Sequence, residues 1–130
     1  MTIVKGYFDE FHPTECNIEN FEIIERDLII NVKSNLEIYP PHPLADTHKF
    51  ENSCKVIFKN IKYLRRRLSE YQENKKKYKK RQEFVTEFNQ KLNTNIQYNN
   101  YGFEGFLLNP PGWLDFEVIA EEFYFDDLKN

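Results

Sequence analysis

A chain of 130 residues with 12 Phe and 8 Tyr has the size of a single domain, 1–130, whose core is built from large rings. The net charge of −3 is modest, and no stretch approaches the ~18 to 20 apolar residues of a membrane-spanning helix. The opening stretch MTIVKGYFDEFHPTEC also lacks the apolar run of a secretory signal. These features exclude a spanning helix and such a signal, so we expect a cytoplasmic protein.

The first predicted elements are strands. Residues 20–40, NFEIIERDLIINVKSNLEIYP, are rich in β-branched and aromatic residues with short polar interruptions, which predicts two or three antiparallel strands in a meander. Three prolines in PPHPLADTH (40–48) then predict an exposed loop, because proline removes backbone donors. In CKVIFKNI (54–61), alternation predicts a further strand with Cys54, Val56 and Phe58 on its core side.

From Ile61 the apolar residues recur at helical spacing. Every seventh position is apolar or aromatic at Leu64, Tyr71, Tyr78, Val85 and Leu92. This pattern predicts one long amphipathic helix, or two shorter ones broken near Asn74, ending around Asn93. We favour a helix over 75–92, whereas 61–71 fits either a helix or an edge strand whose arginines face water.

The C-terminal part predicts a hairpin. FEGFLL (103–108) and WLDFEVIA (113–120) read as its two strands, with EFYF (122–125) as a third, and Pro111-Gly112 matches the centre of a type II turn. Strand alternation predicts that one set of side chains faces the core, namely Leu114, Phe116, Val118 and Ala120. The opposite face carries Trp113, Asp115, Glu117 and Ile119. The expected fold class is α+β, an antiparallel β-sheet (meander plus C-terminal hairpin) packed with one long or two shorter amphipathic helices.

Two carboxylates on this hairpin raise the question of catalysis. Asp115 and Glu117 could act as acid and base in glycoside hydrolysis if one were desolvated. Side chains two apart on a strand, however, lie ~6.5 to 7 Å from each other on an open, solvated face. The sequence also offers no nucleophile motif or phosphate loop, so we expect no enzyme and no cofactor.

A basic segment, 62–81, offers an alternative function in nucleic-acid binding. It contains RRR at 65–67 and much of the run KKKYKKRQ at 75–82, where clustered cations would release counterions from phosphates. The candidate contacts are Lys75, Lys76, Lys77, Lys79, Lys80 and Arg81. The competing interpretation is the solvated face of an amphipathic helix, which the acidic pI of 5.7 favours.

Metal ligation is the remaining chemistry to weigh. The candidate residue types are His12, Cys16, His42, His48 and Cys54. Their spacing includes no C-x-x-C or H-x-x-x-H pair, so we expect no metal site. In a reducing compartment the two cysteines are expected to be free thiols.

An acidic aromatic surface is left after these exclusions. In DFEVIAEEFYFDDL (115–128), rings alternate with carboxylates, a combination that suits protein partners because rings supply desolvated area and charges steer a basic partner. The candidate contacts are Trp113, Asp115, Glu117, Glu121, Glu122, Tyr124 and Asp126. The alternative is a C-terminal edge strand kept soluble by its charge.

The chain resembles, in general character, the immunity proteins that accompany bacterial polymorphic or contact-dependent toxins. This resemblance is carried by the small size, the bias toward residues with A/T-rich codons, the lack of a catalytic set, the predicted β-meander and helix, and the acidic aromatic end. The hairpin GFLLNPPGWLDFEVIAEEF, about 20 of the 130 residues, is similar to C-terminal hairpins of small bacterial β-rich proteins. The resemblance implies a non-enzymatic inhibitor that binds a cognate toxin domain, such as a basic nuclease, and no membrane partner.

Overall fold

The computed structural model describes residues 3–72, 75–87 and 96–128. The side chains of Thr14, Tyr78, Lys80 and Arg81 lie outside that description. Among the described residues, regular structure is almost entirely β-strand, and helical conformation is limited to two short 3-10 turns, Phe8–Glu10 and Pro13–Glu15, and to Lys75. The predicted α+β class with amphipathic helices is therefore wrong, and the fold is nearly all β.

Ten strands make up two sheets. They are β1 (Ile3–Lys5), β2 (Phe11–His12), β3 (Asn17–Ile24), β4 (Asp27–Ser34), β5 (Leu36–Ile38), β6 (Lys49–Glu51), β7 (Cys54–Gln72), β8 (Lys77–Glu87), β9 (Asn99–Leu107) and β10 (Gly112–Asp126). The larger sheet has the order β1-β10-β9-β3-β4-β7-β8, and the smaller one has the order β2-β5-β6. The strands expected within 20–40 and the two strands of the C-terminal hairpin are confirmed, but the separate third strand predicted at 122–125 is wrong, because these residues continue β10.

Five strands of the larger sheet close into a barrel. β10 pairs with both β9 and β7, β7 pairs with β4, and β4 pairs with β3. Closure comes from a short parallel contact in which Asn17 and Ile18 of β3 pair with Phe106 and Leu107 of β9. β1 and β8 are added outside this ring, each paired with one neighbour in the described part of the chain.

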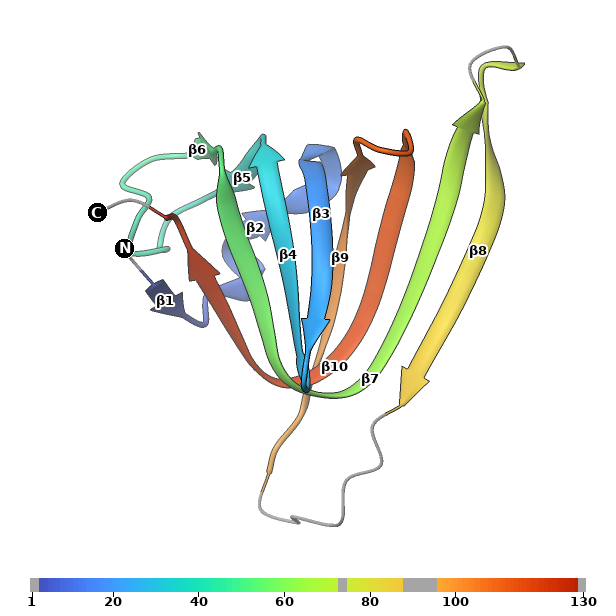
Figure 1. Ribbon diagram of the computed structural model, residues 1–130. Coiled ribbons are helices and arrows are strands. Elements are labelled where there is room, and N and C mark those ends of the chain that lie inside the picture. The colour runs from blue at the N-terminus through green and yellow to red at the C-terminus, as the bar shows by residue number, and fades with distance from the viewer. Residues whose placement is uncertain (1–2, 73–74, 88–95, 129–130) are drawn as a thin grey trace.

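The two longest strands, β7 and β10, run antiparallel along almost their whole lengths. Both curve strongly near their middle, so that each contributes one arm to either side of the molecule (Figure 1). The first arm of β7 pairs with β4, whereas the second arm pairs with β8. The β7–β8 hairpin therefore extends past the barrel as a projecting wing (Figure 1).

The curvature of β7 explains why its sequence resembles a helix. Phe58, Ile61 and Leu64 are all buried although they are three residues apart. Asn60 has a positive φ of 55°, and Lys62 is an extra residue between Ala120–Ile61 and Ile119–Tyr63 in the pairing with β10. Each irregularity shifts the inward-facing set by one residue. Two shifts in quick succession thus produce the i, i+3 spacing that predicted a helix.

The seven-residue spacing was equally misleading. Seven is odd, so residues seven apart point to opposite faces of an uninterrupted strand. Leu64 is 2% exposed, whereas Tyr71 is 38% exposed and Val85 on β8 is 54% exposed. The helix predicted over 75–92 is wrong for 77–87, and 88–92 lies outside the described residues. For 61–71 the strand alternative is correct, although this part of β7 lies between β10 and β8 and is not an edge.

The core is aromatic, as the composition suggests. Phe58 and Phe123 face each other across β7 and β10 with ring centroids 5.2 Å apart. Phe8 from the first 3-10 turn packs edge-on against Phe123 at 5.0 Å, and Phe11 packs against Phe125 at 5.1 Å. The loop 40–48 contributes as well, because His42 is buried among these rings, so that loop is less exposed than its prolines predict.

The hairpin between β9 and β10 differs in detail from the predicted type II turn. Leu107 pairs with Gly112, which makes Gly112 the first residue of β10. Gly112 has no positive φ, and the peptide bond between Asn109 and Pro110 is cis. Glycine is required at 112 because a Cβ there would lie 2.7 Å from the Ser69 carbonyl oxygen on β7. Close strand approach explains this glycine better than turn geometry.

Candidate binding site

The outward-facing side chains of β7 form ion pairs with their neighbours on both sides. Arg67 Nη2 lies 2.6 Å from Asp115 Oδ2 on β10. Arg65 Nε lies 2.5 Å from Glu83 Oε1 on β8, and Arg65 Nη1 lies 3.7 Å from Glu117 Oε2 on β10. We call these five residues the outer ladder. Two arginines in this ladder pair with three carboxylates, so this face carries charges of both signs with a small acidic excess.

Trp113 lies at the β9–β10 end of the same face. Its ring meets Phe106 of β9 edge-on, with centroids 4.9 Å apart at an interplanar angle of 85°. Asp115 is paired in register with Glu104 of β9, which places a second carboxylate near Arg67. The face predicted from alternation is thus confirmed, but it is covered in part by side chains of β7 and β9.

The other predicted contact residues lie along the second arm of β10. Glu121 accepts a hydrogen bond from Asn60 Nδ2 at 3.0 Å. Glu122 pairs with Lys5 of β1 and accepts a hydrogen bond from the Tyr124 hydroxyl at 3.0 Å, which raises the pKa of Tyr124. Asp126 is only 5% exposed and accepts a hydrogen bond from the Leu128 amide. The seven candidates share one strand, and each has an intramolecular contact.

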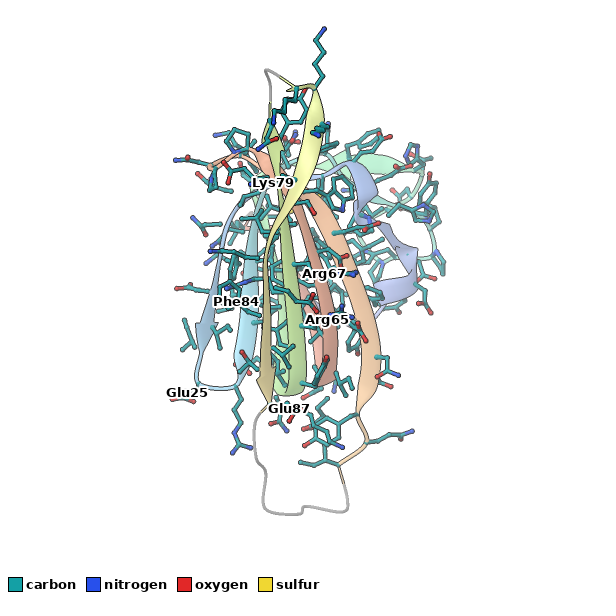
Figure 2. The ribbon with its side chains drawn as sticks, turned by 90° about the vertical axis from the view of Figure 1, so that its right-hand side faces the viewer. Glu25, Arg65, Arg67, Lys79, Phe84 and Glu87 are labelled. Carbon is teal, nitrogen blue, oxygen red and sulfur yellow. The ribbon has the colours of Figure 1, made fainter. Side chains whose placement is uncertain are left out.

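The basic segment is split by the strand alternation. Arg65 and Arg67 belong to the outer ladder, whereas Lys75, Lys76 and Lys77 are exposed at the tip of the β7–β8 wing. Lys79 follows on β8 near this tip (Figure 2). Of the remaining candidates, Lys80 and Arg81 lie on β8, and their side chains are outside the described set.

The inward face of the wing borders a cavity of about 280 Å³. Its walls come from β3, from the second arm of β7, from β8 and from the β9–β10 turn. The lining includes Glu19, Asn20, Phe21, Arg66, Leu68, Gln82 and Asn109. The cavity lies between β3 and β8, and we call it, together with the neighbouring inward-facing residues Ile23 and Phe84, the β3–β8 groove.

Arg66 lies in the middle of the β3–β8 groove. Its guanidinium carbon is 4.7 Å from the ring centroid of Phe21 on β3 and 4.4 Å from that of Phe84 on β8. Burial lowers the pKa of Arg66 below its ordinary value. Unlike Arg65 and Arg67, Arg66 makes no ion pair with any carboxylate of the described residues.

Apolar side chains of this groove remain exposed. Phe84 is 45% exposed and Ile23 is 38% exposed, although their register partners Arg66 and Leu28 place both on the inward faces of their strands. Figure 2 shows Phe84 on one side of β8 and the outward-facing Arg65 and Arg67 on the other. The wing therefore has two different faces, one with paired charges and one with rings around an arginine.

Sequence reasoning missed Arg66 because the helix interpretation treated RRR as one solvated cluster. In a strand, consecutive side chains point to opposite faces. Three consecutive arginines in β7 must therefore place the middle one opposite to the outer two. The strand interpretation of 61–71 therefore already implied that Arg66 faces away from Arg65 and Arg67.

The histidines and cysteines lie in separate surroundings. Cys16 and Cys54 are both free and buried, as expected, and burial raises the pKa of Cys16 to about 12. His48 Nε2 lies 2.7 Å from Glu37 Oε1 at the surface, whereas His42 is enclosed by rings. Among the described residues, no group of three or more His, Cys, Asp or Glu side chains could hold a metal ion.

The described part of the chain contains no helix long and apolar enough to cross a membrane. Comparisons of the sequence with protein-family models and with curated proteins, and of the structure with solved structures, found no match. Function is therefore inferred from the geometry of the wing.

Proposed function

We propose that this protein is a cytoplasmic, non-enzymatic binding protein that acts by occupying a surface of a partner protein. The particular form that we propose is that of an immunity protein, which neutralises a cognate bacterial toxin by covering it. The β7–β8 wing is the part of the molecule that would make this contact.

The observation that carries the proposal is the outer strand of the wing. β8 spans Lys77–Glu87 and pairs with β7 alone in the described part of the chain. One side of its backbone thus remains open, and Phe84 and Val85 are both about half exposed on its two faces. An open edge with large apolar side chains associates readily with another chain. A partner that pairs with β8 would cover both features.

In this proposal the acidic residues of β10 are not an unpaired acidic surface that attracts a basic partner. Asp115 and Glu117 already pair with Arg67 and Arg65, so a partner would meet paired charges of both signs there. Paired charges at the rim of an interface orient a partner and add little affinity. Trp113, packed on Phe106, adds an aromatic contact to the same face.

Site-specific photo-crosslinking in cells of the source organism tests the proposal. A benzophenone amino acid replaces Val85 in one variant and Lys33, an exposed residue of β4, in a control variant. We expect one adduct of discrete mass from position 85 and none from position 33. An absence of adducts, or the same adducts from both positions, contradicts binding through the wing.

The inhibitor form has its own test. If the captured partner is a toxin, co-expression of this protein should restore growth, and the purified proteins should form a complex of fixed stoichiometry by light scattering. A partner whose activity is unchanged in the complex would contradict inhibition while leaving protein binding intact. A toxin gene adjacent to the gene of this protein is the expected source of the partner.

A second candidate function, nucleic-acid binding, is favoured by one observation. Lys75, Lys76, Lys77 and Lys79 are exposed at the tip of a hairpin that projects past the barrel. The probe is a labelled single-stranded oligonucleotide, measured by anisotropy at several salt concentrations. If the lysines contact phosphates, the binding constant K falls with rising salt. Replacing all four lysines with Gln should then make the plot of log K against log salt less steep by about 3. Unchanged binding would exclude the lysines of this tip as a nucleic-acid-binding site.

A further inference from the structure

We propose that the β3–β8 groove binds an extended segment of a partner chain, and that Arg66 pairs with the carboxylate of an Asp or Glu side chain in that segment. This inference rests on the proposed protein-binding function and names the chemistry of the ligand. The partner surface would then include both the open edge of β8 and the inward face of the wing.

The geometry around Arg66 favours a planar anion in the plane of the guanidinium. Rings of Phe21 and Phe84 lie close to its guanidinium carbon, at 4.7 Å and 4.4 Å. Stacked rings use the faces of a guanidinium and leave its N–H groups free to donate along the edge. A carboxylate accepts two such hydrogen bonds side by side, which is the strongest geometry for this pair.

Charge complementarity distinguishes Arg66 from its neighbours in the sequence. Arg67 has Asp115 and Arg65 has Glu83, whereas Arg66 is partly buried and has no carboxylate among the described residues. A cation that has lost water without gaining an anion raises the free energy of the folded state. A ligand carboxylate would offset that cost, whereas a neutral ligand would not.

The shape of the groove favours an internal segment over a chain end. Arg66 lines the cavity together with Gln82 and Asn109, and Phe84 lies beside it as its register partner on β8. The exposed side chain of Ile23 lies two residues beyond Phe21 on β3. A chain passing over Arg66 would contact the cavity and these apolar side chains. Past Ile18, the edge of β3 that faces away from β4 also has no strand partner among the described residues, so the backbone of a ligand could pair with β3 or β8.

Replacing Glu19 should change the affinity for the ligand in the opposite direction from replacing Arg66. It lines the same cavity and makes no ion pair with Arg66. Its carboxylate would repel an acidic ligand without satisfying the arginine. Neutralising Glu19 should therefore strengthen binding of the ligand that Arg66 recognises.

The experiment uses the full chain as the target for a phage-displayed library of random peptides with blocked C-termini. We expect enriched peptides with an acidic residue at one fixed position among β-branched residues. Synthetic amidated versions should bind Arg66→Gln about 10 to 100 times more weakly, because a charge-assisted pair is lost. Lys33→Gln, at an exposed position of β4, should bind as the unchanged protein does, and Glu19→Gln should bind more tightly.

The outcomes separate this inference from the proposed function. An adduct from position 85 together with peptides that lack an acidic residue, or that ignore Arg66→Gln, overturns the groove proposal alone. If peptide binding depends on Arg66 but position 85 gives no crosslinked adduct in cells, the proposed function is overturned instead. If Arg66→Gln fails to fold by circular dichroism, Arg66→Lys keeps the charge without the planar fork and should also weaken binding. Equal binding by Arg66→Lys would contradict the bidentate pairing.

Discussion

Arg67 and Asp115 lie opposite each other in the β7–β10 pairing, and Arg67 Nη2 donates a hydrogen bond to Asp115 Oδ2 at 2.6 Å. This contact joins the basic middle of the sequence to its acidic end. The face that Asp115 shares with Glu117 consequently carries paired charges of both signs, whereas Arg66 on the other side of β7 has no carboxylate partner among the described residues.

The Arg67–Asp115 pair should contribute a small but measurable coupling energy. Both side chains are about one-third exposed, so solvent screens the pair, and we expect about 0.5 to 1 kcal/mol. A double-mutant cycle with Arg67→Ala, Asp115→Ala and the double variant, followed by urea unfolding, measures this coupling. The corresponding cycle for Arg65 and Glu117, at 3.7 Å, should give a smaller value. Equal couplings for the two pairs would contradict the structure.

Two glycines should be intolerant of alanine, and a third provides a control. A Cβ at Gly105 would lie 2.7 Å from Cys16 Sγ, and a Cβ at Gly112 would lie 2.7 Å from the Ser69 carbonyl oxygen. We expect Gly105→Ala and Gly112→Ala each to lower the free energy of unfolding by about 1 to 3 kcal/mol. A Cβ at Gly102 would meet no atom within 4 Å, so Gly102→Ala should be neutral or slightly stabilising.

Urea unfolding of the three alanine variants checks this prediction. A Gly102→Ala variant as unstable as the other two would show that strand conformation, and not close approach, governs these positions.

The thiol of Cys16 should be inert in the folded protein. Burial raises its pKa to about 12, so almost no thiolate exists near neutral pH. We expect iodoacetamide to label Cys16 only after unfolding in urea, as read by mass spectrometry of its peptide. Labelling of the native protein at the rate of an exposed thiol would mean that the β3–β9 contact opens readily.

Stability should decrease in mild acid because of His42. Burial is the main cause of its lowered pKa, with Lys49 adding to the effect and Glu51 opposing it. Below the ordinary value of 6.5, the unfolded chain binds a proton that folded His42 does not, so the free energy of unfolding falls as pH falls. The stabilising contribution is complete above pH 6.5 and is lost toward the lower pKa of the folded state.

Urea unfolding from about pH 7.5 to about pH 5.5 measures this effect, whose slope is at most about 1.4 kcal/mol per pH unit for one proton. His42→Gln should reduce the slope, whereas His12→Gln, at an exposed position, should leave it unchanged. A slope that survives His42→Gln would assign the acid sensitivity to other groups.

Alternation could be read reliably where strands are regular. Leu114, Phe116, Val118 and Ala120 follow a simple period of two and are buried as predicted. Between Phe58 and Leu64 the period fails, because Asn60 has a positive φ and Lys62 shifts the register with β10, and local spacing then carries no information about the strand. The pairing of β7 with β10 that causes these shifts joins residues far apart in the chain, which a local pattern does not contain.

The candidate site was predictable only in part for the same reason. Asp115 and Glu117 were placed correctly on an outward face, but their partners Arg67 and Arg65 lie about fifty residues earlier in the sequence. Arg66 becomes distinctive only once β7 is known to be a strand between two others. Phe21 and Phe84, which surround it, come from strands that do not pair with each other.

The place of β10 in the sheet also bears on how this protein is made. β10 pairs with β1, β7 and β9, so the barrel lacks a wall until residues 112–126 have been synthesised. Before that point a nascent chain can form pairings that do not need β10, such as β3–β4, β4–β7 and β7–β8. Their exposed edges would be open to other chains on the ribosome. The barrel thus closes only after β10 has emerged, and the wing is available to a partner before then.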